Sequence, residues 1–225
     1  NNILGPSDIR KIHENIYKNQ FNDKNILNFF DLRFDLDINS KKKLKILIDS
    51  NFKENNNFFG INFFNFPDNL KKLCYIAISH FLKNDKNNFL CNDFSITNLI
   101  YASLADYYKS MQKAEEQIRK ALKLNSKVIL NSDSNRFIFA LTEDGKLLST
   151  EEDIVNYQNN SPIYQIYVKN KKIDNNDINN FNLLKNFEEK KFFITKLSDE
   201  IPNLSNKAKQ EIKNSNIIIF SPGTQ

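Results

Sequence analysis

The order of apolar and polar positions along the chain predicts an α/β protein. Helical spacing of apolar residues predicts helices at residues 7–16, 24–34, 40–49, 67–81, 99–105, 111–122 and 202–212. Apolar and β-branched runs predict strands at residues 89–91, 127–130, 136–142, 146–148, 163–168, 192–197 and 217–220. Asp144-Gly145 indicates a hairpin turn, and Thr150 with Asp153 resembles a capping box. We expect residues 51–66 to form a long loop and residues 169–182 an exposed linker.

The last predicted strand ends in a turn that suits a ligand. Residues 217–220 are apolar and mostly β-branched, which is typical of a buried parallel strand. The turn that follows contains Ser221, Pro222, Gly223 and Thr224, at the carboxyl end of the strand, where open α/β sheets bind ligands. A glycine there lets backbone N–H groups approach a phosphate closely. An ordinary strand-to-helix turn is the alternative interpretation.

Polar residues also gather between the strand at residues 89–91 and the apolar helix that follows it. Asp93, Ser95, Thr97 and Asn98 lie at this boundary. One such residue is enough to cap a helix, so the presence of Ser95, Thr97 and Asn98 together suggests that the free N–H groups of the helix also hold an anion. We expect this loop and the turn at residues 221–224 to lie at the same edge of a mostly parallel sheet.

Two arginines near the first helices complete the set of candidate phosphate ligands. Ser7 is a candidate N-cap, and Asp8 and Arg10 lie in the first turn of its helix. Arg10 could donate two hydrogen bonds to a phosphate, although an ordinary capped surface helix explains the same residues. Arg33 lies near the end of the second predicted helix.

Composition narrows the classes of function. The 225 residues suit one domain over 1–225, with a largely helical insertion at residues 37–86. The net charge is +5 and the lysines are scattered, which argues against a nucleic-acid-binding protein but suits an anionic small molecule. Two cysteines and two histidines form neither a disulfide framework nor a metal site. Without a signal peptide or a membrane-spanning apolar run, we expect a reduced, cytoplasmic protein that is part of a longer chain.

Four stretches in this order resemble one known family. Pro6-Ser7-Asp8-Ile9-Arg10 is similar to the family's Pro-Gly-Asp-Ile/Leu-Arg, and Leu32-Arg33-Phe34 to its Tyr-Arg-Phe. Asp93-Phe94-Ser95-Ile96-Thr97-Asn98-Leu99 is similar to its Gly-His-Ser-Leu/Ile-Gly-Asn-Leu, and Ile219-Phe220-Ser221-Pro222-Gly223-Thr224 to its Ile-Gly-Pro-Gly-Ser. The strands around Asp144-Gly145 fit as well. The chain therefore resembles the 2-phospho-L-lactate transferase and gluconeogenesis-factor family (CofD-like and YvcK-like proteins).

The chain departs from the family at several positions. Asp93 and Thr97 replace two glycines, Phe94 replaces a histidine, and Ser221 replaces the first glycine of Gly-Pro-Gly. The family's N-terminal strand with its Gly-Gly-Thr-Gly loop is absent from this sequence. These changes put side chains where a phosphate would meet bare backbone, so affinity or ligand identity is expected to differ.

The resemblance implies a Rossmann-like three-layer α/β fold that binds a nucleotide diphosphate or a nucleotide sugar. In the enzymatic branch, a phosphoryl-linked group moves from a nucleotide-activated donor to an alcohol acceptor, with Mg²⁺ assisting. The other branch consists of non-enzymatic nucleotide-sugar-binding regulators of cell-wall and carbon metabolism. A purely structural asparagine-rich module is a third interpretation. The insertion at residues 37–86 could serve as a lid, a homodimer contact or an interaction surface.

Overall fold

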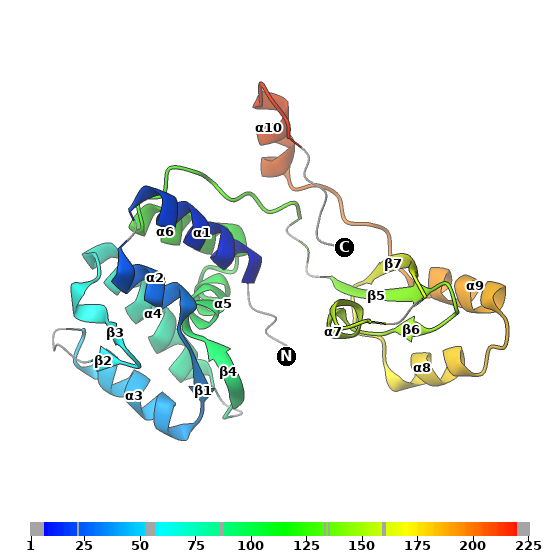
Figure 1. The fold of residues 1–225 in the computed structure, drawn as a ribbon, viewed down its shortest axis with the longest axis horizontal. Coiled ribbons are helices and arrows are strands. Elements are labelled where there is room, and N and C mark those ends of the chain that lie inside the picture. The colour runs from blue at the N-terminus through cyan, green and yellow to red at the C-terminus, as the bar shows by residue number, and fades with distance from the viewer. Residues whose placement is uncertain are drawn as a thin grey trace. The chain divides into compact units, whose positions relative to one another are not determined.

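A computed structural model of the chain describes residues 7–21, 23–52, 57–85, 88–132, 134, 136–158 and 161–219. By its internal contacts the chain divides into two compact units, Asn1–Leu130 and Asn131–Gln225. Figure 1 shows the helices and strands of each unit. The sequence-based prediction was one domain over residues 1–225, whereas contacts within the chain gather into these two units.

The first unit is mainly helical. Its elements are α1 (Ser7–Gln20), α2 (Lys24–Asp31), β1 (Arg33–Leu36), α3 (Ile38–Asp49), β2 (Asn57–Phe58), β3 (Ile61–Asn62), the 3-10 helix η1 (Phe63–Asn65), α4 (Asp68–Asn84), β4 (Cys91–Ser95), α5 (Ile96–Tyr108) and α6 (Met111–Ala121). Helix α5 contacts α1, α2, α4 and α6. It buries Ile96, Ile100 and Leu104 almost completely. The apolar character of α5 is therefore explained by its central place in this unit.

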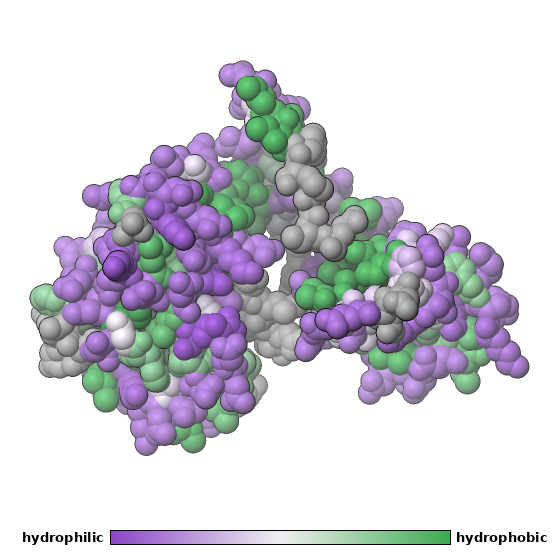
Figure 2. All heavy atoms as spheres, viewed as in Figure 1, coloured by the Kyte–Doolittle hydropathy of each residue, from purple (hydrophilic) through white to green (hydrophobic). Residues whose placement is uncertain are grey.

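The second unit is a small sheet with helices. Its elements are β5 (Phe137–Thr142), β6 (Leu147–Leu148), α7 (Glu151–Val155), β7 (Ile163–Lys169), α8 (Asn175–Asn182), α9 (Phe187–Leu197) and α10 (Asn206–Asn214). The strand order is β6-β5-β7. Phe139 and Leu141 of β5 share one core with Phe181 of α8 and Ile194 of α9. Figure 2 shows apolar side chains gathered on the visible face of this unit, and Ile166 of β7 is 52% exposed.

The predicted Rossmann-like fold with a mostly parallel sheet is wrong. Every strand pair in the described part of the chain is antiparallel: β1 with β4, β2 with β3, and β5 with both β6 and β7. Residues 217–219 form no strand, and Ile217 and Ile219 are 79% and 87% exposed. An apolar run shows only that a segment could be buried, because a strand also needs a neighbouring strand to pair with. Phe220 lies outside the described residues.

Several other element predictions are also corrected. Residues 192–197 belong to helix α9, and residues 127–130 form no strand. The predicted linker at residues 169–182 contains helix α8, which Asp174 and Asp177 cap reciprocally. The second helix ends at Asp31, because the chain then enters β1 and pairs with β4.

The segment at residues 37–86 helps to build the core of the first unit. It contains helices α3 and α4, as predicted. The expected loop at residues 51–66 instead contains the β2–β3 hairpin and η1. Phe58, Phe63 and Phe66 are almost fully buried. The rings of Phe63 and Phe66 each pack edge-on against the ring of Phe29, and they are tilted against each other. These buried phenyl groups explain how a segment so rich in asparagine contributes to the core.

Candidate functional site

Three of the four family-like stretches meet at the start of helix α5. Arg10 of α1 donates from Nη1 to the carbonyl oxygen of Phe30, at 2.6 Å. Thr97 donates from Oγ1 to the same carbonyl, at 3.3 Å. The N–H of Ile96 donates to the carbonyl of Leu32, at 3.2 Å. Residues that lie far apart in the sequence are therefore joined around the end of α2 and the start of α5.

The hydroxyl groups in this region serve mainly to cap and anchor α5. Ser95 is the N-cap, and its Oγ accepts a hydrogen bond from the N–H of Asn98, at 3.3 Å. The Oγ of Ser95 and the Oγ1 of Thr97 lie 3.0 Å apart, and both residues are buried. Their contacts match the capping interpretation, since both hydroxyls already have partners within the protein.

Arg33 and Asp93 form an exposed ion pair between β1 and β4. Nε of Arg33 lies 2.6 Å from Oδ1 of Asp93, and Nη2 donates to the main-chain carbonyl of Asp93. The side chains are 49% and 72% exposed. The hydrogen bond from Arg33 holds the pKa of Asp93 below its usual value, and in turn raises the pKa of Arg33. A guanidinium at this place can bind an anion, and in this structure it binds the carboxylate of Asp93.

Asn98 has a buried end without a partner. Its Oδ1 is buried and makes no hydrogen bond among the described residues. A buried polar atom without a partner costs free energy, so such an atom in a native protein calls for an explanation. The two ends of a carboxamide exchange places by rotation, so Asn98 can present either a donor or an acceptor to a ligand.

The remaining predicted site residues do not join this group in the described structure. Asp8 is exposed in the first turn of α1. Ser221, Pro222, Gly223 and Thr224 lie outside the described residues, and so does the expected meeting of their turn with Asn98 at one edge of a sheet.

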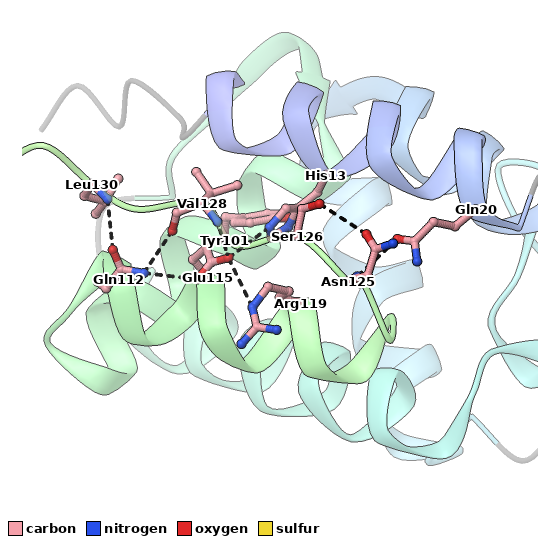
Figure 3. A network of polar contacts seen from close by, with 10 residues as sticks. All are labelled: His13, Gln20, Tyr101, Gln112, Glu115, Arg119, Asn125, Ser126, Val128 and Leu130. Atoms are coloured by element: carbon pink, nitrogen blue, oxygen red, sulfur yellow. Dashed lines mark hydrogen bonds and ion pairs between the residues drawn. The ribbon is translucent and has the colours of Figure 1, made fainter. Parts of the chain in front are cut away.

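A buried polar network close to this region was missed by the sequence reasoning. Nδ1 of His13 lies 2.5 Å from the hydroxyl of Tyr101, and Nε2 lies 3.2 Å from Oε1 of Glu115. His13 and Glu115 are fully buried, and Tyr101 is 1% exposed (Figure 3). A carboxylate only accepts hydrogen bonds, so Nε2 of His13 is the donor in its contact with Glu115. Burial, with a smaller effect from Glu115, raises the pKa of Tyr101.

The same network holds the chain segment that follows α6. Oε1 of Glu115 accepts from the N–H of Val128, at 3.1 Å. Gln112 donates from Nε2 to Oε2 of Glu115 and to the carbonyl of Val128, at 3.1 and 3.0 Å, and its Oε1 accepts from the N–H of Leu130, at 2.9 Å (Figure 3). These side chains satisfy backbone groups that a strand partner would otherwise satisfy, which explains why residues 127–130 need no strand.

A sequence signal for this network did exist. His13 lies four residues after Ile9 and four before Tyr17, all three on the buried face of α1. Glu115 follows Ala114 and lies three residues before Ile118, on the buried face of α6. A titratable residue inside an apolar helical stripe indicates a buried polar partner on another element. Because the network is closed to solvent, its contacts are structural ones.

Three further findings concern ligands and relatives. Among the described residues, no group of three or more His, Cys, Asp or Glu side chains could hold a metal ion. None of the helices in the described part of the chain has the length and apolar character needed to cross a bilayer. No family model, curated protein or solved structure matches the chain.

Proposed function

We propose that the first unit binds the diphosphate of a nucleotide or nucleotide sugar at the start of α5. The proposed activity is that of a transferase of the 2-phospho-L-lactate transferase type, moving a phosphoryl-linked group from a nucleotide-activated donor to an alcohol. The observation that carries the proposal is the convergence of three family-like stretches, through the contacts of Arg10, Ile96 and Thr97 with the end of α2. The proposal does not depend on a parallel sheet.

The polar groups at this place suit a phosphate, although Arg33 contacts Asp93 and Arg10 pairs with Glu14 in this structure. Arg33 is half-exposed and carries a guanidinium whose planar donors match phosphate oxygens. Asn98 contributes a carboxamide with one unpartnered buried end. Arg10 is anchored to Phe30 and keeps a buried Nε without a hydrogen-bond partner among the described residues. Phosphoryl transfer depends mostly on positioning and charge neutralisation, which such groups can provide without a protein nucleophile.

Mg²⁺ fits this proposal as a companion of the phosphates. Proteins commonly hold Mg²⁺ with only one or two carboxylates, the other ligands being phosphate oxygens and water, so the ion would be held mainly by the phosphates of the ligand. When bound, Mg²⁺ would neutralise phosphate charge. The two free cysteines, Cys74 and Cys91, suit a reducing compartment, and we propose the cytoplasm.

A non-enzymatic nucleotide-sugar-binding regulator is the second candidate. Phe94 stands where the family has a histidine, and the hydroxyls of Ser95 and Thr97 are already engaged within the protein. Both observations reduce the number of groups available for chemistry, which favours a protein that binds the ligand without turnover. The two candidates share a ligand class and differ in turnover.

A thermal-shift and calorimetry panel on the full chain tests the proposal. GDP, UDP and a UDP-sugar should stabilise the protein more than the matching nucleosides, and their stabilisation should reach about 2.7 kcal/mol at a ligand concentration near one hundred times Kd. Asn98→Ala should weaken nucleotide affinity by about 1–3 kcal/mol, the range for loss of a hydrogen bond to a charged group. Equal stabilisation by nucleoside and diphosphate would refute a phosphate anchor. Turnover with a deazaflavin alcohol acceptor would separate the transferase from the regulator.

A further inference from the structure

The guanidinium of Arg33 is already occupied by another residue of the chain. Two of its nitrogens contact Asp93: Nε meets the carboxylate oxygen Oδ1, and Nη2 meets the main-chain carbonyl. Nε and Nη2 form one edge of the guanidinium, and an edge of this kind binds a phosphate through two parallel hydrogen bonds, so a phosphate on this edge would displace both contacts of Asp93.

The backbone holds Asp93 firmly in this position. Its φ is +50°, in the left-handed region, which Asp and Asn tolerate better than most residues. Its N–H donates to Oδ1 of Asp35 on β1, at 3.0 Å. The antiparallel register places Arg33 opposite Ser95, two residues from Asp93. The carboxylate is therefore placed by the β1–β4 pair itself.

We propose that Asp93 acts as an internal competitor for the phosphate at Arg33, so that ligand binding exchanges one anion for another. This inference rests on the proposed function, and the ligand class is the same diphosphate. Both side chains are exposed to solvent, and exposed ion pairs are weak, so the exchange needs no rearrangement of the core. Asp93 would then lower the affinity of the site and tune it to high ligand concentrations.

Asp93→Asn is the sharpest test, because asparagine keeps the shape and tolerates the same backbone angles while it removes the charge. The affinity of the full chain for GDP and for inorganic pyrophosphate, measured by calorimetry in EDTA at low salt, should rise about two- to fivefold. Asp68→Asn is the matched control: it removes the same charge from a 96% exposed aspartate of the same unit, beside Lys71, and should leave affinity unchanged.

A double-mutant cycle separates competition for Arg33 from a general effect of charge. If Asp93 acts through Arg33, the gain from Asp93→Asn should disappear in an Arg33→Gln background. A gain that persists in that background, or no gain at all in the parent, would overturn the inference. Weaker binding of Asp93→Asn that appears only when Mg²⁺ is added would assign Asp93 to the metal and also overturn it.

A ligand-free measurement keeps this test separate from that of the proposed function. The ¹⁵N–¹H signal of the Arg33 Nε–H group should shift and become more mobile in Asp93→Asn, because its hydrogen-bond acceptor loses its charge. An unchanged signal would refute the contact even in a protein that binds nucleotide. A changed signal, with no binding of GDP or pyrophosphate by any variant, would show that the contact exists but that the phosphate site does not, and the inference would fail together with the proposed function.

Discussion

Replacement of Glu115 by alanine should destabilise the first unit strongly. The side chain is fully buried and touches the N–H of Val128, Nε2 of Gln112 and Nε2 of His13, at 3.1, 3.1 and 3.2 Å. Each donor left without its partner costs about 1–3 kcal/mol, and these costs are not additive within a network. Oε1 of Glu115 also lies 3.7 Å from Nε of the partly buried Arg119, and the removal of one member of a buried charged pair typically costs about 3–5 kcal/mol. We expect a loss of about 3–5 kcal/mol in the unfolding free energy of this unit.

Glutamine at this position should also be costly, but less so. Its carbonyl could still accept from Val128, while its NH₂ group would face the NH₂ group of Gln112, which already donates to the Val128 carbonyl. Two NH₂ groups would then face each other without an acceptor between them, and we expect a loss of about 1–3 kcal/mol in unfolding free energy. Lys120→Ala is the control on the same helix, since Lys120 is exposed, and should change stability by less than about 0.5 kcal/mol.

Hydrogen exchange is the suitable assay, because the chain has two units and a single melting curve would combine them. Amides of α5 report the global stability of the first unit, and the amides of Val128 and Leu130 report the local contacts. In Glu115→Ala, both sets should lose protection. The structural role of Glu115 would be refuted by a variant in which α5 keeps its protection within about 1 kcal/mol of the parent.

Local chemistry in the sequence predicted several elements well. The helices α3 and α4, the hairpin of β5 and β6 and the strand β7 all lie where the pattern placed them. Thr150 and Asp153 form the expected capping box of α7. Gly145 has a φ of +78°, as a turn with Asp-Gly requires. In each case, residues close in sequence determine the structure.

Two of the errors concern helices whose N-terminal capping residues were overlooked. Residues 192–197 look like a strand in isolation, yet Asn186 caps the N–H of Glu189, and two glutamates occupy the first turn of α9. Ile194 then faces the core at helical spacing from Phe187. Helix α8 was likewise hidden by its asparagines, although Asp174 caps it. In both segments the prediction followed the amino-acid composition, whereas the capping residue indicates the helix.

The candidate site could be predicted only in part. Three motifs marked Arg10, Arg33 and Thr97, and the structure places all three around the start of α5. The contact of Arg33 with Asp93 could not be predicted, because Arg33 was assigned to the end of a helix. Its position opposite Ser95 follows from the pairing of β1 with β4, segments separated by about sixty residues.

Three smaller predictions follow from single residues. Hydrogen bonds from the backbone and hydroxyl of Ser40 lower the pKa of Asp37. The Asp37 cap therefore stabilises α3 at pH values above the ordinary Asp pKa of about 3.9, and this stabilisation is lost as the pH falls through the lowered pKa. Asp37→Asn should abolish this pH dependence, as measured by amide exchange of α3. Cys91 should react with a thiol reagent in the native protein, whereas Cys74, whose thiol pKa is raised by burial, should react only on unfolding; equal rates would contradict this. Gly145→Ala should cost about 1–2 kcal/mol, because φ is +78° and the new Cβ would lie 3.4 Å from Cδ of Lys190. Since Lys190 also donates to the Gly145 carbonyl at 2.9 Å, the turn and α9 should lose amide protection together, and a loss confined to the turn would show that this contact does not couple them.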